Sequence, residues 1–393
     1  MKKVLVCGVG NSRNLGDRII AETINYLIHL SDEPIQVTNF DFTVGKVQNS
    51  EKNTKIKLNS TSLLKKLTPN FFRRIKVLNH YKNNNSLKIE LEECIANTDL
   101  IVIGGGHLLI DNYLNFPKGI NNIVKVAKSN NIPVVFSFVG AKGPWNKLAK
   151  MYLLEALDYA RCISVRDSDS KDFLVSISKD LKSKVVVLSD PALFVKEMCD
   201  YKQKVQAKKK IGLGIMDPHE LKRHSNFKWS RDESAFWWST LTKKLISLGF
   251  DVNIFTNGSP TDNGFVEFFI KKELGENKNV FYSDYPSDYS DLISIIQQQD
   301  IVIAQRLHAC LPSISLGKNT FGVIWDRKLS SIFRELRLED NLIDFTKDTE
   351  NIIKQIITNL DENNNLVNRV NEVINIKKKE MLKFAREELW EEN

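Results

Sequence analysis

Short runs rich in β-branched residues alternate with longer helical patterns along almost the whole chain, and this alternation constrains the fold more than any other feature. Strands that alternate with helices are joined by crossover connections, so they form parallel sheets with helices on both faces. We therefore expect an α/β protein. The predicted strands cover residues 4–8, 35–39, 100–103, 134–139, 162–165, 185–188, 211–216, 252–256, 280–282, 301–304 and 320–324.

A polar, lysine-rich stretch at residues 202–210 separates the strands of the first half from those of the second. The 393 residues are enough for two domains. We predict a Rossmann-like domain over residues 1–200, a second one over 201–345, and a helical segment over 346–393 that packs across both. Ligands of such folds bind at the carboxyl ends of the strands, which predicts a cleft where the two parallel sheets face each other.

The chain has 56 Lys and Arg residues against 48 Asp and Glu, and the excess is concentrated in an insertion at residues 45–88. Eleven basic residues and a single acid, Glu51, lie between Lys46 and Lys88. Because leucines and phenylalanines are interleaved with them, the segment can either lie on an anionic membrane surface or form a solvated insertion. We expect no nucleic-acid partner, because the stretch contains no recognisable binding module.

The five cysteines are widely spaced and lie mostly in apolar runs, which predicts buried thiols in a reducing compartment. No ligand spacing indicates a metal site, and no apolar run approaches the roughly 18 residues of a membrane span. We expect a cytoplasmic protein whose basic segment can reach the inner face of the membrane.

Glycines follow the first predicted strand and lead into a helix, in the order Gly8, Gly10 and Gly16. The backbone N–H groups of such a turn and helix start can bind an anion. The spacing matches neither the dinucleotide fingerprint nor a Walker loop, so a purely structural turn with Asp17 as the helix cap is the alternative.

Three glycines at 104–106 end the third predicted strand, and His107 follows them. Consecutive glycines at a strand end indicate that a ligand or another chain segment comes close to the backbone. We favour a ligand at Gly105 and Gly106. His107 either meets that ligand or is satisfied by a backbone carbonyl.

Arg166 and Asp167 end the strand predicted at 162–165. A guanidinium cannot lose its proton to escape burial, so Arg166 needs a carboxylate or a phosphate as its partner. That partner is either Asp167 or another acid of the protein, or it is a bound anion.

Arg306, Leu307 and His308 follow the strand predicted at 301–304. In extended geometry, a cation and an imidazole two residues apart lie on one face, which favours anion chemistry at the mouth of a cleft. Asp326 and Lys328 add charge after the next strand, directly before a helix.

These motifs, in this order, resemble the polysaccharide pyruvyl transferases over nearly the whole chain. The chain departs from the family's usual Gly-x-Pro turn with Gly317-Lys318-Asn319, which changes no charged group. The matching segments are Asn14-Leu15-Gly16-Asp17, the glycines 104–106, Ser164-Val165-Arg166-Asp167 with Ser170, Asp190-Pro191-Ala192, Arg306-Leu307-His308, and Asp326-Arg327-Lys328 before Leu336-Arg337-Leu338-Glu339-Asp340.

The resemblance implies two Rossmann-like domains arranged as in B-type glycosyltransferases. It also implies transfer of the enolpyruvyl group of phosphoenolpyruvate to two hydroxyls of one sugar, which gives a pyruvate ketal and phosphate without a cofactor. Arg166 and Arg306 are then expected to bind the trianionic donor, and His308 to protonate its methylene carbon. The other candidate substrate-binding residues are Asn14, Gly16, Asp17, Gly105, Gly106, His107, Asp167, Leu307, Asp326 and Lys328.

The acceptor implied by the resemblance is a sugar of a cell-surface polysaccharide precursor, which can be carried on a polyprenyl lipid. Its hydroxyl protons need a base, and His308, Asp17 and Asp167 are equal candidates. A nucleotide-sugar glycosyltransferase of the same architecture is the first alternative function. A non-catalytic protein that binds anionic saccharides is the second.

Overall fold

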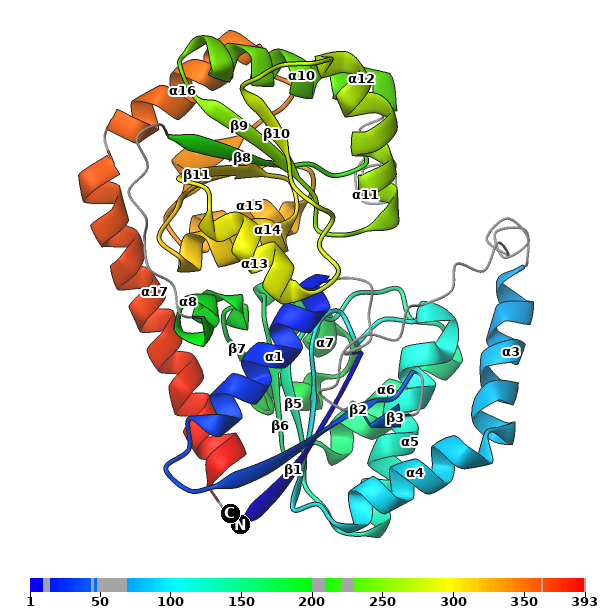
Figure 1. Ribbon diagram of the computed structural model, residues 1–393. Coiled ribbons are helices and arrows are strands. Elements are labelled where there is room, and N and C mark those ends of the chain that lie inside the picture. The colour runs from blue at the N-terminus through cyan, green and yellow to red at the C-terminus, as the bar shows by residue number, and fades with distance from the viewer. Residues whose placement is uncertain are drawn as a thin grey trace. The chain divides into compact units, whose positions relative to one another are not determined.

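The computed structural model describes residues 1–9, 15–43, 46–47, 69–199, 209–220, 229–361 and 363–391. The chain divides into two compact units (Figure 1). Unit 1 comprises Met1–Asn11, Ile20–Pro191 and Glu380–Asn393, and unit 2 comprises Ser12–Ile19 and Ala192–Lys379. Each unit contains its own sheet and is described by itself.

Unit 1 is built on a seven-stranded sheet. Its strands are β1 (Lys2–Gly8), β2 (Ile35–Asp41), β3 (Lys46–Val47), β4 (Leu100–Gly104), β5 (Val134–Val139), β6 (Cys162–Val165) and β7 (Val185–Val187). They lie in the order β3-β2-β1-β4-β5-β6-β7, and all neighbours are parallel except β3, which is antiparallel to β2. The order steps outward in both directions from β1 and β4, as in a doubly wound fold.

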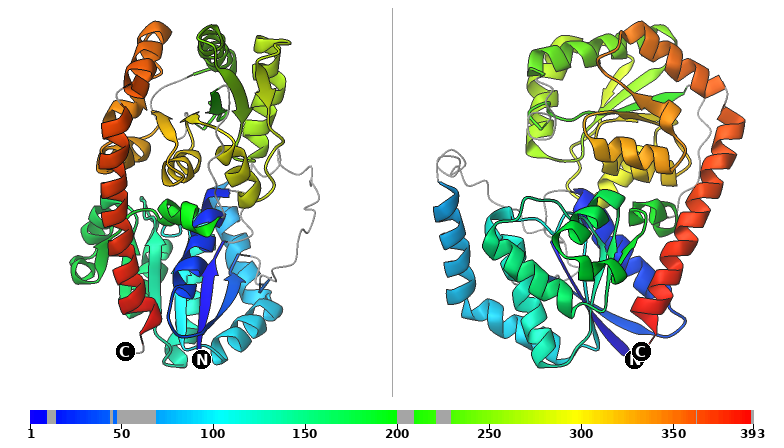
Figure 2. Two further views of the ribbon diagram at one scale, coloured as in Figure 1. Left: turned by 60° about the vertical axis from the view of Figure 1, so that its left-hand side comes forward. Right: turned by 180° about the vertical axis from the view of Figure 1, so that it is seen from behind.

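Helices cover both faces of this sheet (Figure 2). They are α1 (Leu15–His29), α4 (Asn85–Ala96), α5 (Asn115–Ser129), α6 (Lys147–Tyr159), α7 (Ser168–Ile177) and the end of α17 (Asn363–Ala385). Helix α3 (Asn70–Asn83) lies at the margin of unit 1 (Figure 1). On one face, α4, α5 and α6 share a core with the central strands. On the other face, Ile24 of α1 lies against Gly104, and Phe384 of α17 packs edge-to-face on Phe138.

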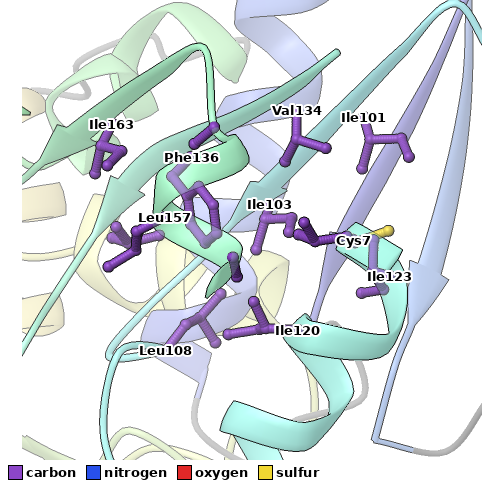
Figure 3. Close-up of a cluster of buried hydrophobic side chains, with 14 of the residues drawn as sticks. Cys7, Ile101, Ile103, Leu108, Ile120, Ile123, Val134, Phe136, Leu157 and Ile163 are labelled. Carbon is purple, nitrogen blue, oxygen red and sulfur yellow. The ribbon is translucent and has the colours of Figure 1, made fainter. Parts of the chain in front are cut away.

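The central strands of unit 1 are apolar on both faces because both faces are covered. Figure 3 shows the core on the α5 and α6 side, where Ile103 and Phe136 point from the sheet toward Ile120, Ile123 and Leu157. Each of these five side chains is inaccessible to solvent. The continuous apolar runs of the sequence therefore become strands buried on both sides.

Unit 2 has a six-stranded parallel sheet in the order β10-β9-β8-β11-β12-β13. Its strands are β8 (Lys210–Gly214), β9 (Asp251–Phe255), β10 (Val280–Tyr282), β11 (Ile301–Ala304), β12 (Asn319–Val323) and β13 (Leu342–Ile343). The order reverses between β8 and β11, and a doubly wound sheet binds its ligands at such a reversal.

Three helices of unit 2 begin at side chains that cap them. Ser230 and Glu233 form a capping box at the start of α10, and Asp288 and Asp291 form one at α13. Asp326 accepts the N–H of Leu329 and so caps α15. The helices are α8 (Val195–Met198), α10 (Arg231–Ser247), α11 (Pro260–Phe265), α12 (Lys271–Leu274), α13 (Tyr289–Gln297), α14 (Leu307–Ser315), α15 (Arg327–Glu335), α16 (Thr349–Asp361) and the first part of α17.

The expected α/β fold with parallel sheets is confirmed, and each predicted strand lies within two residues of its predicted bounds. The two-residue strands β3 and β13 are not predicted, because so short a run has no recognisable pattern. The chain passes from unit 1 to unit 2 at residues 191–192, and α17 passes from unit 2 back into unit 1 at Glu380. Most of the stretch 202–210 lies outside the described residues. The predicted cleft between the domains stays a prediction.

Candidate active site

The first turn of α1 belongs to unit 2, although the rest of the helix belongs to unit 1. Gly16 lies in this turn against the imidazole of His308, so that a Cβ atom at position 16 would be 2.3 Å from Nδ1. Only glycine leaves room for the ring there. The two motifs that contain Gly16 and His308 come from opposite ends of the chain, and the fold brings them into contact.

Arg18 holds the same turn against the loop between β10 and α13. Its Nη1 donates to the Ser287 carbonyl at 3.2 Å and lies 3.6 Å from the Asp288 carboxylate. Asp17, in the first turn of α1, is half-buried. The start of α1 therefore lies at the carboxyl edge of the unit 2 sheet, where the N–H groups of its first turn can attract an anion.

Arg306 stands at the N-terminus of α14, directly beyond β11, and its side chain is paired with Asp262 of α11. Nε and Nη2 of Arg306 lie 3.0 and 2.8 Å from Oδ2 of Asp262, and Nη2 also lies 3.0 Å from Oδ1. The Asp262 side chain is inaccessible to solvent, whereas Arg306 keeps 25% of its side chain exposed. Among the described residues Nη1 has no partner, so that edge of the guanidinium can still bind an anion.

A second ion pair supports the first. The backbone N–H of Asp217, which follows β8, donates to Oδ1 of Asp262 at 2.9 Å. Arg231 of α10 in turn binds the Asp217 carboxylate with Nε at 3.2 Å and Nη2 at 2.6 Å. Burial raises the pKa of Asp262, and the charge of Arg306 opposes that rise. Helix α11, the segment after β8 and helix α10 together fix the Arg306 guanidinium.

Asp262, Asp217 and Arg231 are missing from the residues predicted by sequence. One signal for them existed: Asp217 and Asp262 follow the carboxyl ends of two neighbouring strands, β8 and β9. A half-buried Arg306 at the edge of the same sheet requires an acid, and these are acids that the strand order can deliver.

The prediction that Arg306 and His308 share one face of an extended segment is wrong. The strand ends at Ala304, and residue 306 is already the cap of α14. His308 lies in the first turn of that helix with φ −84° and ψ 21°. The chain turns between the two residues, so Arg306 faces Asp262 while His308 faces Gly16, and the buried Leu307 lies between them in sequence.

Asp326 and Lys328 lie just beyond β12, as predicted from the strand pattern. Asp326 accepts the N–H of Leu329 at 2.9 Å, which is the role of a helix cap. Lys328 is half-buried in the first turn of α15. The contacts of Asp326 thus show a structural function, and a substrate contact stays a prediction for both residues.

Arg166 of unit 1 has a partner within the protein. Nη1 of Arg166 lies 3.3 Å from Oδ2 of Asp190, and both side chains are almost wholly buried. Asp167 is not that partner, because it caps α7 by accepting the N–H of Ser170 at 2.7 Å. Nε of Arg166 is buried without a hydrogen-bond partner among the described residues. The internal pair that the sequence left open is therefore Arg166 with Asp190.

Close packing and backbone conformation account for the three glycines at 104–106 of unit 1. A Cβ atom at Gly104 would lie 2.4 Å from Ile24 and 2.9 Å from the carbonyl of Ser137, so another segment makes the close approach there. Gly105 and Gly106 have φ values of 96° and 84°, which glycine adopts most readily. A bound ligand at these two glycines stays a prediction.

His107 of unit 1 packs against Gly140, which follows β5. A Cβ atom at Gly140 would lie 2.4 Å from Nδ1 of the His107 ring. The backbone N–H of Gly140 donates to the carbonyl of Gly106 at 2.9 Å, which joins the ends of β4 and β5. Unit 1 therefore gathers His107, Arg166 and Asp167 at the carboxyl edge of its sheet, as Gly16, Arg306 and His308 gather in unit 2.

The remaining predictions concern Asn14, a metal site and a membrane-spanning helix. Asn14 lies outside the described residues. Within the described ranges, no three His, Cys, Asp or Glu side chains are close enough together to hold a metal ion, and no helix is long and apolar enough to cross a bilayer.

Solved structures of UDP-GlcNAc 2-epimerases share the fold of this chain. The enzyme from Neisseria meningitidis, bound to UDP-GlcNAc, is 15% identical with a TM-score of 0.56, over 98% of this chain and 100% of that chain. The enzyme from Methanocaldococcus jannaschii is 12% identical with a TM-score of 0.59, over 91% and 92%. At these identities the likeness shows the fold alone, which is that of two Rossmann-like domains.

Comparison of the sequence with protein families identifies a narrower group of proteins than the fold does. No curated protein matches the chain. Residues 14–327, however, match the family model described as polysaccharide pyruvyl transferase. This range begins at the glycine turn of α1 and includes both arginine motifs and the histidine. The chain therefore belongs to the polysaccharide pyruvyl transferase family.

Proposed function

We propose that this transferase moves the enolpyruvyl group of phosphoenolpyruvate onto two hydroxyls of one sugar in a cell-surface polysaccharide precursor. The contact between Gly16 and His308 carries the proposal, because it places an imidazole at a helix N-terminus, beside the loop that supplies Arg306. A helix N-terminus and a guanidinium both attract phosphate and carboxylate, and an imidazole can act as a general acid or base.

In the proposed reaction, the donor binds to the Nη1 edge of Arg306, since Asp262 occupies the Nε edge. Arg166 keeps its expected role as a second cation for the donor. It can supply the donor with the N–H of Nε, which has no other described partner. Asp262 and Asp217 are proposed to act as positioning residues that hold Arg306 in one orientation.

His308 is proposed to donate a proton to the methylene carbon of the donor, which becomes a methyl group and leaves a cationic centre at C2. One sugar hydroxyl then bonds to C2, the bond from C2 to the phosphate oxygen breaks, and the second hydroxyl closes the ketal. Of the two hydroxyl protons, one restores His308 and the other leaves on phosphate. A single imidazole can therefore act as acid first and as base afterwards.

The contacts of the other candidate bases differ. Asp167 already accepts a backbone N–H at the start of α7, which ties it to a structural role. Asp17 directly follows Gly16, the residue that lies against the imidazole of His308. We therefore place Asp17 second to His308 as the base.

The rival function is transfer of a sugar from a nucleotide donor. It is worth testing because an epimerase of the same fold is described bound to UDP-GlcNAc. Thermal unfolding of the purified protein distinguishes the two donors without an acceptor. Phosphoenolpyruvate should raise the melting temperature, whereas UDP and GDP should leave it unchanged. Stabilisation by UDP or GDP alone would overturn the proposal.

A further inference from the structure

Helix α3, the described end of the basic insertion, presents an apolar outer face. Phe71 and Phe72 are 67% and 59% exposed, and Ile75, one turn further on, is exposed as well. The two phenyl rings pack edge-to-face with centroids 5.7 Å apart. In Figures 1 and 2, α3 stands at the margin of unit 1, away from the sheet. Two adjacent exposed aromatic side chains are unusual on a surface in contact with water alone.

The opposite face of α3 is fixed to unit 1. The Tyr81 hydroxyl donates to the carbonyl of Phe42 at 3.2 Å. Arg73 donates to the Tyr113 hydroxyl at 3.0 Å, and Arg74 donates to Asp111 at 3.1 Å. The outward direction of the phenylalanines is therefore set by polar contacts on the inner face.

The charged side chains of α3 itself have one sign. None of the 14 residues of α3 is acidic, and Lys76 and Lys82 are exposed on the helix. The preceding residues add more lysines, with Lys65 and Lys66 nearest in sequence. Phe236 of α10 is exposed to a similar extent, 66%, but its charged neighbours differ. It follows the acidic residues Asp232 and Glu233 in the first turn of that helix.

We infer that the outer face of α3 binds the surface of an anionic lipid bilayer. Phe71, Phe72 and Ile75 would enter the boundary between headgroups and acyl chains, and Lys76 and Lys82 would meet the anionic headgroups. The combination of exposed aromatic rings with one-signed charge favours this occupant over a second copy of the chain, whose own α3 would repel it. The inference does not depend on the proposed transfer reaction.

Sedimentation of the full chain with lipid vesicles tests the inference. The protein should sediment with vesicles that contain phosphatidylglycerol and phosphatidylcholine, and should stay in solution with phosphatidylcholine alone. Raising the salt concentration should release it, because the lysine contribution is screened. The double variant Phe71→Ser/Phe72→Ser should bind at least about tenfold more weakly, since two aromatic anchors are lost. The control Phe236→Ser, matched in residue type and exposure, should bind like the wild type.

Three results would overturn the inference. The first is failure of the wild type to bind the anionic vesicles. The second is equal binding of the double variant and the wild type. The third is concentration-dependent dimerisation, without vesicle binding, that Phe71→Ser/Phe72→Ser abolishes, since the occupant of the face would then be a second copy. Thermal unfolding of each variant should match the wild type, so that a loss of binding is not a loss of folding.

Discussion

Both units place an Arg–Asp pair at the carboxyl edge of a parallel sheet, but the two pairs differ in geometry and in access to solvent. In unit 1, Arg166 meets Asp190 through one contact at 3.3 Å, and its side chain is 3% exposed. In unit 2, Arg306 meets Asp262 through two nitrogens, and its side chain is 25% exposed. The first pair is almost wholly buried, whereas the second holds an arginine whose outer edge is open.

The difference shows how the same residue types can serve two purposes. A fully buried pair must balance the loss of hydration of both charges, and removing one partner leaves the other without compensation. A pair whose arginine stays partly exposed can instead orient a cation toward a ligand. We therefore expect the unit 2 pair to matter most for activity and the unit 1 pair to matter most for stability.

The largest expected effect is on turnover. His308→Gln should lower the rate of acceptor-dependent phosphate release from phosphoenolpyruvate by about 10²–10⁴-fold, the usual contribution of a general acid. The melting temperature should change little, because glutamine fits beside Gly16. His29→Gln, an exposed histidine near the end of α1, is the matched control and should keep full activity. Normal turnover in His308→Gln would favour a protein that only binds saccharides.

The next effect is on stability. Asp190→Ala should destabilise the protein by about 3–5 kcal/mol in urea unfolding, because it leaves Arg166 as a buried, uncompensated charge. Asp262→Ala should destabilise it less, since water can reach Arg306. Equal losses in the two variants would remove the distinction between the pairs.

Gly16→Ala tests the contact between Gly16 and His308. The added methyl group would lie 2.3 Å from Nδ1 of His308, so the ring or the helix must move. A shift of this size should lower kcat by about 10²-fold. Gly264→Ala in α11 is the matched control, because a Cβ atom there meets nothing within 4 Å. If Gly16→Ala turns over like the control, the ring position does not matter for the chemistry.

The smallest expected effect is a pH dependence. Burial raises the pKa of Asp262 above its ordinary value, so the folded state keeps the proton to a higher pH than the unfolded state does. The wild type should therefore lose stability relative to Asp262→Asn as pH rises from about 4, and the difference should level off above the folded pKa. The opposite slope in thermal unfolding would mean that Arg306 outweighs the effect of burial.

The sequence predicts the sheets well because buried parallel strands are continuous apolar runs, as at β4 and β11. It also identifies which residues follow the strands, since Arg166 and Arg306 do so at β6 and β11. It does not predict which acid pairs with each arginine. Asp190 follows β7, the neighbour of β6, whereas Asp262 lies in α11 after β9, which β8 separates from β11. These pairings depend on strand order, which is a tertiary property.

Local geometry is the other part that the sequence does not reveal. Nothing in the apolar run at 301–304 indicates whether the strand continues past Ala304 or turns at once into a helix. Arg306 and His308 are therefore wrongly expected on one face. The assignment of the first turn of α1 to unit 2 depends on long-range packing around Gly258 and Pro286. No pattern within α1 indicates it.

Calorimetric titration of phosphoenolpyruvate into the wild type, Arg306→Lys and His308→Gln tests whether Arg306 binds the donor. We expect the wild type to bind, His308→Gln to bind with similar affinity, and Arg306→Lys to bind about 10- to 100-fold more weakly, because a lysine cannot reproduce the two-sided guanidinium contacts. Equal affinity of Arg306→Lys and the wild type, or binding of UDP in place of phosphoenolpyruvate, would contradict this expectation.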